Sequence, residues 1–466
     1  MTRHVLAAHL GPDDSYVPEA AADEAVTRFD LVTGQRSLGR GIGPALRALR
    51  DLGVRPTETG VDLIVVAAHV HAADTRLSRV ATSQDGWTRE IGLVVPVSEP
   101  ERWSAAAPIL ERMLRFLTGD HWRIRFRPRP AGFENLSPAY LPGFEIADFD
   151  GIALFSGGLD SLIGAIDTLV AGERPLFVSH AGEGAVSGPQ RDLFDKLNER
   201  LPGDRRLNRN LPRLRFALTF PRNLVRGVPG EDSTRGRSFL FLAIGAMAGS
   251  GLRRPFDLRV PENGLIALNV PLDPTRLGSN STRTTHPYYL RRWNELLIAI
   301  GIEGTVVNRY WDQTKGEMVA GCRVSAVLRD LTPLSVSCAH PSQGRYARDR
   351  RRHCGTCVPC LIRRAAVEGA WGRGNDPTGY RCDDLAERPL DATRSEGRQV
   401  RGFQYAIGRL AASPDLARIL IHKPGPLKED ARNLDRLAGV YGRGMVEVGR
   451  LLQGVETFSP AMPELP

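Results

Sequence analysis

Within residues 151–170, GIALFSGGLDSLIGAIDTLV, the segment SGGLDS at 156–161 combines two adjacent glycines, two hydroxyl side chains and a carboxylate. A short apolar run precedes the glycines and an apolar-periodic segment follows them, which predicts a strand, a tight turn and a helix. Adjacent glycines let the backbone approach a ligand closely, and a helix start presents its positive dipole end to an anion. The pattern therefore predicts a phosphate-binding loop made of Ser156, Gly157, Gly158, Leu159, Asp160 and Ser161.

This loop is not of the Walker type, because the Walker lysine is absent and Asp160 lies inside the loop. A carboxylate beside a phosphate requires a cation between them, so the loop implies that Mg2+ binds together with the nucleotide. The stretch resembles the SGGxDS loop of ATP pyrophosphatases, which cleave ATP between its α and β phosphates and adenylate a substrate. The alternative is a plain Gly-Gly turn in an unrelated α/β protein.

Two arginines stand at a second expected helix start, in the segment STRGRS at residues 233–238. Cations at a helix start oppose the helix dipole, so arginines are poor choices there unless they face an anion. We assign Arg237, and more weakly Arg235, to the phosphates of ATP. A solvated helix entrance in an arginine-rich chain is the alternative.

Other candidate residues follow later strands. Glu262 and Asn263 directly follow an expected strand, where a carboxylate and an amide can read the edge of a small heterocycle, although Asn-Gly is also a common turn pair. The long polar segment after them ends at His286 and is more typical of a substrate lid than of a linker. Lys315 opens another helix, and with only four lysines in the chain we favour a role near the phosphates.

The cysteines suggest a metal site. Cys354, Cys357 and Cys360 form Cys-x2-Cys-x2-Cys, and Cys338 lies sixteen residues upstream. Thiolates at such spacing can converge on one ion, and four of them complete a closed tetrahedral zinc site. An iron–sulfur cluster accepts the same ligands and stays open on this reasoning.

The chain as a whole predicts three regions: an α+β domain at residues 1–145, a central α/β domain at 146–384 and a helical region at 385–466. In the first region, the apolar run at 61–70 predicts a buried strand. The central region alternates strands and helices, which implies a doubly wound parallel sheet with ligands beyond the carboxyl ends of its strands. Asp74, Arg76, Asp85, Trp87 and Arg89 could line a site, but we favour a structural role.

Composition adds broad limits. The net charge is +9, but basic residues are spread along the chain, so basicity is weak support for nucleic-acid binding. No apolar run approaches the length of a membrane span, and the first twenty residues do not match a signal peptide, so we expect a cytoplasmic protein.

Taken together, SGGLDS, the arginine-bearing helix start, TKGE at 314–317 and the cysteine cluster followed by Arg363 resemble 7-cyano-7-deazaguanine synthase (QueC) over residues 150–375. That family uses ATP to adenylate 7-carboxy-7-deazaguanine, lets ammonia form an amide, and adenylates again to reach the nitrile. The resemblance implies a PP-loop fold, an AMP-forming enzyme, ATP, Mg2+ and Zn2+. It assigns Asp160, Arg237 and Lys315 to catalysis, the loop to ATP, and the four cysteines to zinc.

The chain also departs from that family, with an added N-terminal region, PENG at 261–264, a longer gap between the first two cysteines, and a helical tail. These features look like the longer QueC-like component of the Qat anti-phage system (QatC), which occurs beside an ATPase, a small protein and a TatD-like nuclease. They leave the final product open between an amide, a nitrile and a conjugate with a protein amine.

Two other function classes remain. A tRNA-modifying PP-loop enzyme would explain the basic stretches at 204–226 and 345–352, although these have few aromatic residues for base stacking. A non-catalytic nucleotide sensor in a defence complex is the third reading.

Overall fold

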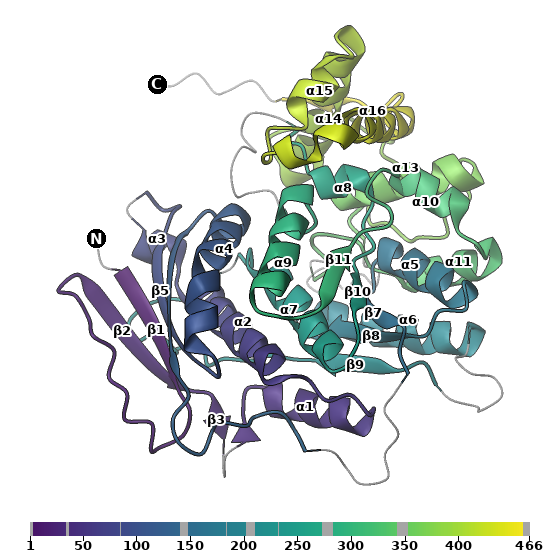
Figure 1. Cartoon of the computed structure of the whole chain (residues 1–466). Helices are drawn as coiled ribbons and strands as arrows, with labels where there is room; N and C mark the ends of the chain where they lie inside the picture. The colour runs from purple at the N-terminus through teal and green to yellow at the C-terminus, as the bar shows by residue number, and fades with distance from the viewer. Residues whose placement is uncertain are drawn as a thin grey trace, which may run out of the picture.

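A computed structural model describes residues 3–33, 37–83, 85–139, 148–182, 184–201, 210–231, 233–272, 283–342 and 353–459. Figure 1 shows two parallel sheets separated by a layer of helices, with a cluster of C-terminal helices lying at one end of the central sheet. The mixed α/β architecture with parallel sheets, expected from the sequence, is confirmed.

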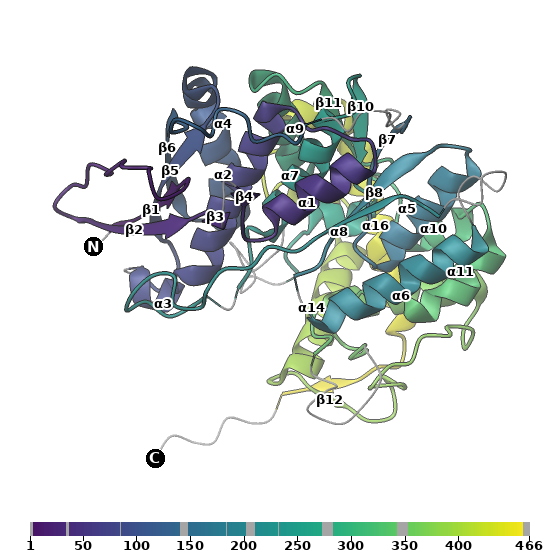
Figure 2. The same cartoon turned by 90° about the horizontal axis from the view of Figure 1, so that it is seen from below.

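The central sheet contains five strands in the order β11-β10-β7-β8-β9, and every described pair is parallel. The alternation of strands and helices predicted for this region is present. Helices lie on both faces of the sheet (Figure 2). The strands are β7 (Gly151–Leu154), β8 (Pro175–His180), β9 (Arg213–Phe216), β10 (Phe256–Arg259) and β11 (Gly304–Val307). The helices between and after them are α5 (Leu159–Val170), α6 (Gly184–Arg200), α7 (Arg237–Ser250), α8 (Gly264–Leu268), α9 (Pro287–Ala299), α10 (Lys315–Gly321), α11 (Ser325–Leu331) and the 3-10 helix η2 (Thr332–Leu334).

The side chains of β7 point alternately to the two faces of the central sheet, and both faces are covered by helices. Ile152 and Leu154 belong to the core that contains α7, whereas Ala153 and Phe155 belong to the core that contains α5. A strand that is apolar on both faces is expected in the middle of a parallel sheet. The loop after β7 therefore starts from a rigid, fully buried strand.

The N-terminal sheet has the order β2-β1-β5-β6 and is parallel throughout, an α/β rather than an α+β arrangement. A small antiparallel ladder joins β3 to β4. The strands are β1 (Arg3–His9), β2 (Glu24–Asp30), β3 (Val32–Thr33), β4 (Ser37–Leu38), β5 (Glu90–Val97) and β6 (His121–Pro128). The helices are α1 (Ile42–Asp51), α2 (Glu58–Arg76), α3 (Arg79–Thr82) and α4 (Pro100–Thr118).

The strand predicted at residues 61–70 is wrong, because this run lies inside the helix α2. The helix begins at Thr57, whose side chain accepts a hydrogen bond from the Gly60 N–H. A short apolar run cannot by itself distinguish a buried strand from a buried helix. Here the segment continues for 19 helical residues and is buried along nearly its whole length, between the N-terminal sheet and α7. The helix predicted after TKGE is also divided into two, α10 and α11.

One apolar core runs across the predicted boundary at residue 145. It joins residues of α2 and α4 to residues of α7 and α9, including the stacked rings of Phe239 and Trp293. The N-terminal region therefore packs as part of the wall of the central region.

The C-terminal helices pack on the carboxyl-terminal part of the central region, where α16 contacts α8, α10 and α13 (Figure 1). The sequence left open whether this tail packs on its own chain, and the structure shows that it does. The elements are α13 (Val358–Trp371), β12 (Leu390–Asp391), α14 (Ser395–Ala412), α15 (Leu416–Leu420), the 3-10 helix η3 (Lys428–Asn433), α16 (Leu434–Leu451) and β13 (Thr457–Phe458).

Candidate functional site

The loop between β7 and α5 has the tight geometry expected of a phosphate-binding loop. Gly157 adopts a φ of 84°, which favours glycine, and its N–H donates to the Ser161 hydroxyl at 3.1 Å. The Ser161 hydroxyl donates to the Gly158 carbonyl at 2.9 Å, so the turn closes on itself. Gln190 of α6 braces the loop by donating to the Ser156 carbonyl at 3.1 Å. A Cβ at Gly157 would lie only 3.1 Å from Gln190, so the loop packs tightly against α6.

The start of α5 is open on the side away from this brace. Gly158 occupies the N-cap position and has no side chain that could cap the helix. Ser156 is exposed beside it, while Leu159 and Asp160 are buried. A helix start with a glycine at its N-cap, next to an exposed hydroxyl, is suited to bind an anion such as phosphate.

Asp160 lies at the centre of a buried polar cluster. Its Oδ1 accepts a hydrogen bond from the Lys315 ammonium, and its Oδ2 accepts from the Asn263 backbone N–H at 3.1 Å and side-chain amide at 2.7 Å. The exposed fractions are 5% for Asp160, 0% for Asn263 and 5% for Lys315. Three segments that the sequence singled out separately thus meet at the carboxyl edge of the central sheet.

Glu262 completes the cluster, and its pKa is shifted in the opposite direction to that of Asp160. Burial favours the neutral form of Asp160, but the Lys315 charge and hydrogen bonds from Glu262, Lys315 and Asn263 outweigh it and lower its pKa to about 2. Burial and the neighbouring Asp160 charge raise the pKa of Glu262 well above its ordinary value. The pKa values of two neighbouring carboxyls are therefore shifted in opposite directions, an arrangement typical of functional sites.

Neighbouring strand ends hold these residues in place. Asn263 caps α8 by accepting from the Ile266 N–H at 3.1 Å. Asn308, at the end of β11, donates to the Glu262 carbonyl at 2.7 Å. Thr314 caps α10 within a capping box, so Lys315 is the first residue of a well-defined helix.

The two arginines of the segment STRGRS point to different places. Arg237 is the first residue of α7. Burial lowers the pKa of His180 to about 3 and that of His71 to about 4, and the nearby Arg237 charge contributes to both shifts. His180 ends β8, next to the phosphate-binding loop, so Arg237 lies at the same edge of the sheet. Arg235 instead stacks on Trp87, with its guanidinium 4.6 Å from the ring centre.

His286, which we expected to contact substrate, caps a helix instead. Its Nδ1 accepts a hydrogen bond from the Tyr288 N–H at 3.2 Å, and its ring packs 5.3 Å from Phe116. Burial lowers the pKa of His286 to about 3, with a smaller effect of Arg283. Among the described contacts, none joins His286 to the Asp160 cluster. Part of the expected lid, residues 273–282, and the basic stretch 345–352 lie outside the described residues.

The four cysteines predicted to bind metal converge. The sulfur atoms of Cys338, Cys354, Cys357 and Cys360 all lie within 4.8 Å of one another. Two pairs, Cys338 with Cys357 and Cys354 with Cys360, are 3.9 Å apart. Four thiolates each about 2.3 Å from one tetrahedral ion would be separated by about 3.8 Å, so the spacing fits a single ion such as zinc. A multi-iron cluster spreads its cysteines over separate irons and requires wider spacing.

Local backbone geometry supports the cysteine cluster. Backbone N–H groups donate to sulfur from His340 and Cys354, both to Cys338, at 3.3 and 3.4 Å. The remaining cysteines are not ligands: Cys322 is buried at the end of α10, and the Cys382 thiol faces the Asp384 carbonyl at 3.6 Å.

A hydrogen-bond path joins α13, the helix that carries Cys360, to the phosphate-binding loop. Arg363 of α13 is fully buried and donates to the hydroxyls of Ser335 at 2.9 Å and Ser337 at 3.3 Å. The Ser337 hydroxyl accepts from the Leu159 N–H at 3.4 Å, and the neighbouring Val336 N–H donates to the Gly157 carbonyl at 2.8 Å. Helix α13 therefore supports the loop from one side. Neither Gln190 nor Ser337 belongs to a motif that could have been recognised in the sequence.

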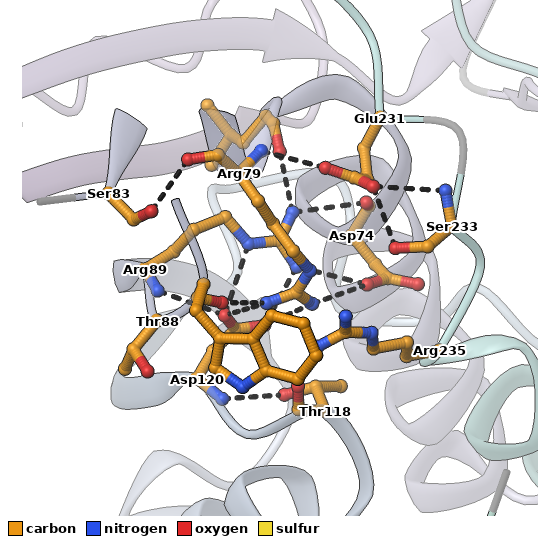
Figure 3. Close-up of polar contacts among 12 residues, drawn as sticks. Asp74, Arg79, Ser83, Thr88, Arg89, Thr118, Asp120, Glu231, Ser233 and Arg235 are labelled. Carbon is orange, nitrogen blue, oxygen red and sulfur yellow. Dashed lines mark hydrogen bonds and ion pairs between the residues drawn. The ribbon is translucent and has the colours of Figure 1, made fainter. Parts of the chain in front are cut away.

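The polar residues of the N-terminal region form a separate buried network, shown in Figure 3. Asp120 accepts from Arg79 and Arg89, and Asp74 accepts from Arg89 at 3.1 Å and from the Gly236 N–H at 2.7 Å. These four charged side chains are 3% exposed or less. The network joins α2, α3, β5 and the start of α7, which agrees with the structural role that we favoured.

Of the other residues considered with it, Arg76 donates to the carbonyls of Phe220 at 2.7 Å and Pro221 at 2.8 Å. Exposed Asp85 accepts from the Trp87 and Thr88 N–H groups at 2.8 Å. Both residues hold loops in place.

Comparison of the chain with family models, curated proteins and solved structures found no match. In the part of the chain that the structure describes, no helix has the length and apolar character needed to cross a membrane.

Proposed function

We propose that this protein is an AMP-forming ligase with a PP-loop fold, which adenylates a 7-deazaguanine carboxylate such as 7-carboxy-7-deazaguanine. The observation that carries the proposal is the convergence of Asp160, Lys315 and Asn263 beside an open, glycine-rich helix start. A simple Gly-Gly turn would not require a buried lysine and two further strand ends to meet at its carboxylate.

The residues present suit Mg-ATP. The uncapped α5 start and the Ser156 hydroxyl would hold phosphate oxygens, and Asp160 would hold Mg2+, which supplies neutralising charge to the leaving pyrophosphate. Lys315 and Arg237 would stabilise negative charge that builds on the α-phosphate as the substrate carboxylate attacks it. Because attack by ammonia or a protein amine then releases AMP, the chain needs no nucleophilic side chain, only positioning and charge.

Glu262, protonated beside Asp160, can donate a hydrogen bond toward a carbonyl or ring nitrogen of the bound heterocycle. We place the deazaguanine near Glu262 and Asn263 because both follow β10, one strand from the phosphate-binding loop. His286 is left out of this assignment because it caps α9.

The resemblance covers residues 150–375, and the chain continues on both sides of that range. We therefore propose that the activated carboxylate is passed on within an anti-phage system, with an ATPase, a small protein and a TatD-like nuclease as partners. In this reading a protein amine competes with ammonia as the acceptor.

The test is ATP consumption with 7-carboxy-7-deazaguanine, with and without ammonia, with AMP and ADP measured separately and the purine weighed by mass. The expected result is AMP and pyrophosphate that depend on the deazaguanine acid and disappear in Asp160→Asn. An amide or nitrile mass shows how far the reaction proceeds, and AMP without a free purine product indicates a protein acceptor. No AMP under any of these conditions would refute the proposed activity.

A further inference from the structure

Helix α16 reaches the start of α10, although more than a hundred residues separate them. The Thr314 hydroxyl donates to Glu447 Oε1, and the Gly316 N–H donates to Glu447 Oε2 at 3.3 Å. These two groups flank Lys315 on either side. A Cβ at Gly316 would lie 2.6 Å from the Glu447 carboxylate, so a larger residue there would displace the carboxylate from this position.

The same helix also packs on the other element that holds Asp160. Gly264, the first residue of α8, leaves room for Val440 of α16, since a Cβ there would lie 2.9 Å from the valine Cγ2. One turn later, Gly444 lets Leu265 approach, with 2.7 Å between a Cβ at Gly444 and the leucine Cδ2. Asn263 caps α8, so α16 contacts both elements that donate to Asp160.

The contact of Glu447 differs from the ion pairs that fix α16 nearby. Arg436 pairs with Asp312 and Arg443 pairs with Glu317, and both arginine side chains are about half exposed or more. Glu447 is half-buried, and burial raises its pKa, whereas the hydrogen bonds from Thr314 and Gly316 oppose that rise. A carboxylate that accepts hydrogen bonds at a helix start is favoured by the helix dipole, so Glu447 fixes this start more firmly than the exposed ion pairs do.

We propose that Glu447 is a positioning residue that fixes the start of α10 and thereby holds the Lys315 ammonium at Asp160. The C-terminal region is in this sense part of the site. The catalytic consequence rests on the proposed function, but the positional claim about Lys315 does not.

The chain offers a direct probe of that position, because it contains only four lysines. Lys196, Lys423 and Lys428 are exposed, whereas Lys315 is 5% exposed and paired. Brief labelling with acetic anhydride, followed by peptide mass spectrometry, reports the reactivity of each lysine in the folded protein. The three exposed lysines serve as internal standards.

In Glu447→Ala we expect the relative labelling of Lys315 to rise about fivefold or more, because the freed helix start lets the ammonium leave Asp160. Glu447→Gln retains one acceptor oxygen, so labelling should return to within about twofold of the wild-type value. Arg436→Ala removes an exposed contact of the same helix and should leave Lys315 labelling unchanged. Unchanged labelling in Glu447→Ala, or an equal rise in Arg436→Ala, would overturn the proposal.

Kinetics supply the second readout. Glu447→Ala should lower kcat for AMP formation by about tenfold with little change in the KM for ATP, and Glu447→Gln should recover most of it. A structural role alone would reduce the folded fraction without this split or rescue. If the wild-type protein forms no AMP, the proposed function fails, while the labelling result still decides whether Glu447 positions Lys315.

Discussion

This protein has two buried clusters of charged side chains, and their carboxyl groups have different partners. In the N-terminal network, Asp74 and Asp120 are both held by guanidinium groups, and Asp74 also accepts the Gly236 N–H (Figure 3). In the cluster around Asp160, one ammonium pairs with Asp160, while burial and the Asp160 charge raise the pKa of the adjacent Glu262 well above its ordinary value. Burial also raises the pKa of Asp74 in the network, so the clusters differ in their cations: two guanidinium groups face the two carboxyls of the network, and one ammonium faces those of the second cluster.

Their surroundings differ in the same sense. The network is covered on all sides, since its four charged members are almost fully buried. The Asp160 cluster lies beside Ser156, which is exposed, and beside a helix start whose N-cap residue is a glycine. Opposite shifts of pKa do not distinguish the two clusters, because Asp74 and Asp120 also carry them. Buried charge therefore marks a functional candidate here where it adjoins a surface that can bind an anion.

The largest expected effect concerns the metal ion expected at the four cysteines. These cysteines lie next to Ser337, which contacts the loop that carries Asp160. Cys357→Ser should abolish stoichiometric metal binding and lower the melting temperature strongly, because a structural zinc ion contributes about 10 kcal/mol or more to folding. Metal analysis and thermal unfolding measure both. Cys382→Ser is the matched control and should retain the ion. An equal loss in both variants, or no ion in the wild type, would contradict the assignment.

Hydrogen exchange can then separate the two regions in the same variant. Peptides from α13 and from residues 156–161 should lose protection in Cys357→Ser, because Arg363 and Ser337 join them. Peptides of the network should stay protected. Uniform loss would mean that the regions do not respond separately.

The next effect is on the network. Asp120→Ala should lower the free energy of unfolding by about 3–5 kcal/mol, because the buried positive charges of Arg79 and Arg89 lose their shared carboxylate partner. Urea denaturation measures it. Asp51→Ala, at an exposed pair with Arg50, is the control and should cost about 0–1 kcal/mol. Similar values for the two variants would show that the network does not stabilise the fold.

Much of this arrangement could be predicted from local sequence. The loop at 156–161 follows from its glycines and its place between strand and helix, and the cysteine spacing identifies four ligands that do meet. The convergence of Lys315 on Asp160 was predicted only loosely, as two residues that follow strands of one parallel sheet. The contact between Lys315 and Asp160 depends on the strand order, which brings the ends of their two strands to the same edge of the sheet.

What could not be predicted depends on long-range packing. Gln190 and Glu447 lie on amphipathic helices without any motif, and their roles come from the elements they pack against. The run at 61–70 was assigned to a strand because continuous burial hides helical periodicity. His286 was chosen as a candidate substrate residue because it ends a polar segment, but the residue at that position also caps the helix that follows.

The third prediction removes the charges of the Asp160 cluster together. The double variant Asp160→Asn/Lys315→Met leaves neither charge of the pair unmatched, so its free energy of unfolding should stay within about 1–2 kcal/mol of the wild type. AMP formation should fall by about a hundredfold or more. Denaturation and the AMP assay, run on one preparation, test both. Strong destabilisation would make this pair structural, like the network, and would remove the contrast.

The smallest effect, and the one most specific to the comparison, is on pH dependence. The pKa of Glu262 is raised in the fold by burial and by the Asp160 charge, so its protonation stabilises the protein below its unfolded pKa. That stability is lost as pH rises through the folded pKa. Glu231 lies beside the network, where its carboxylate accepts from the Arg79 N–H at 2.7 Å. Burial favours its neutral form, but hydrogen bonds from Arg79 and Ser233 outweigh burial and lower its pKa, so its contribution to stability is lost only as pH falls below its ordinary range.

Matched substitutions should therefore behave differently between pH 5 and pH 8, without magnesium or nucleotide. Glu262→Gln should gain stability relative to wild type on going from pH 5 to pH 8, because the wild-type carboxyl must ionise beside Asp160 or hold its proton at a rising cost. Glu231→Gln should differ from wild type by the same amount at both pH values, since the wild-type carboxylate is ionised throughout. Urea denaturation at the two pH values measures both differences. A pH-independent difference for Glu262→Gln would mean that its carboxyl is ionised like that of Glu231, and the two clusters would then share one electrostatic character.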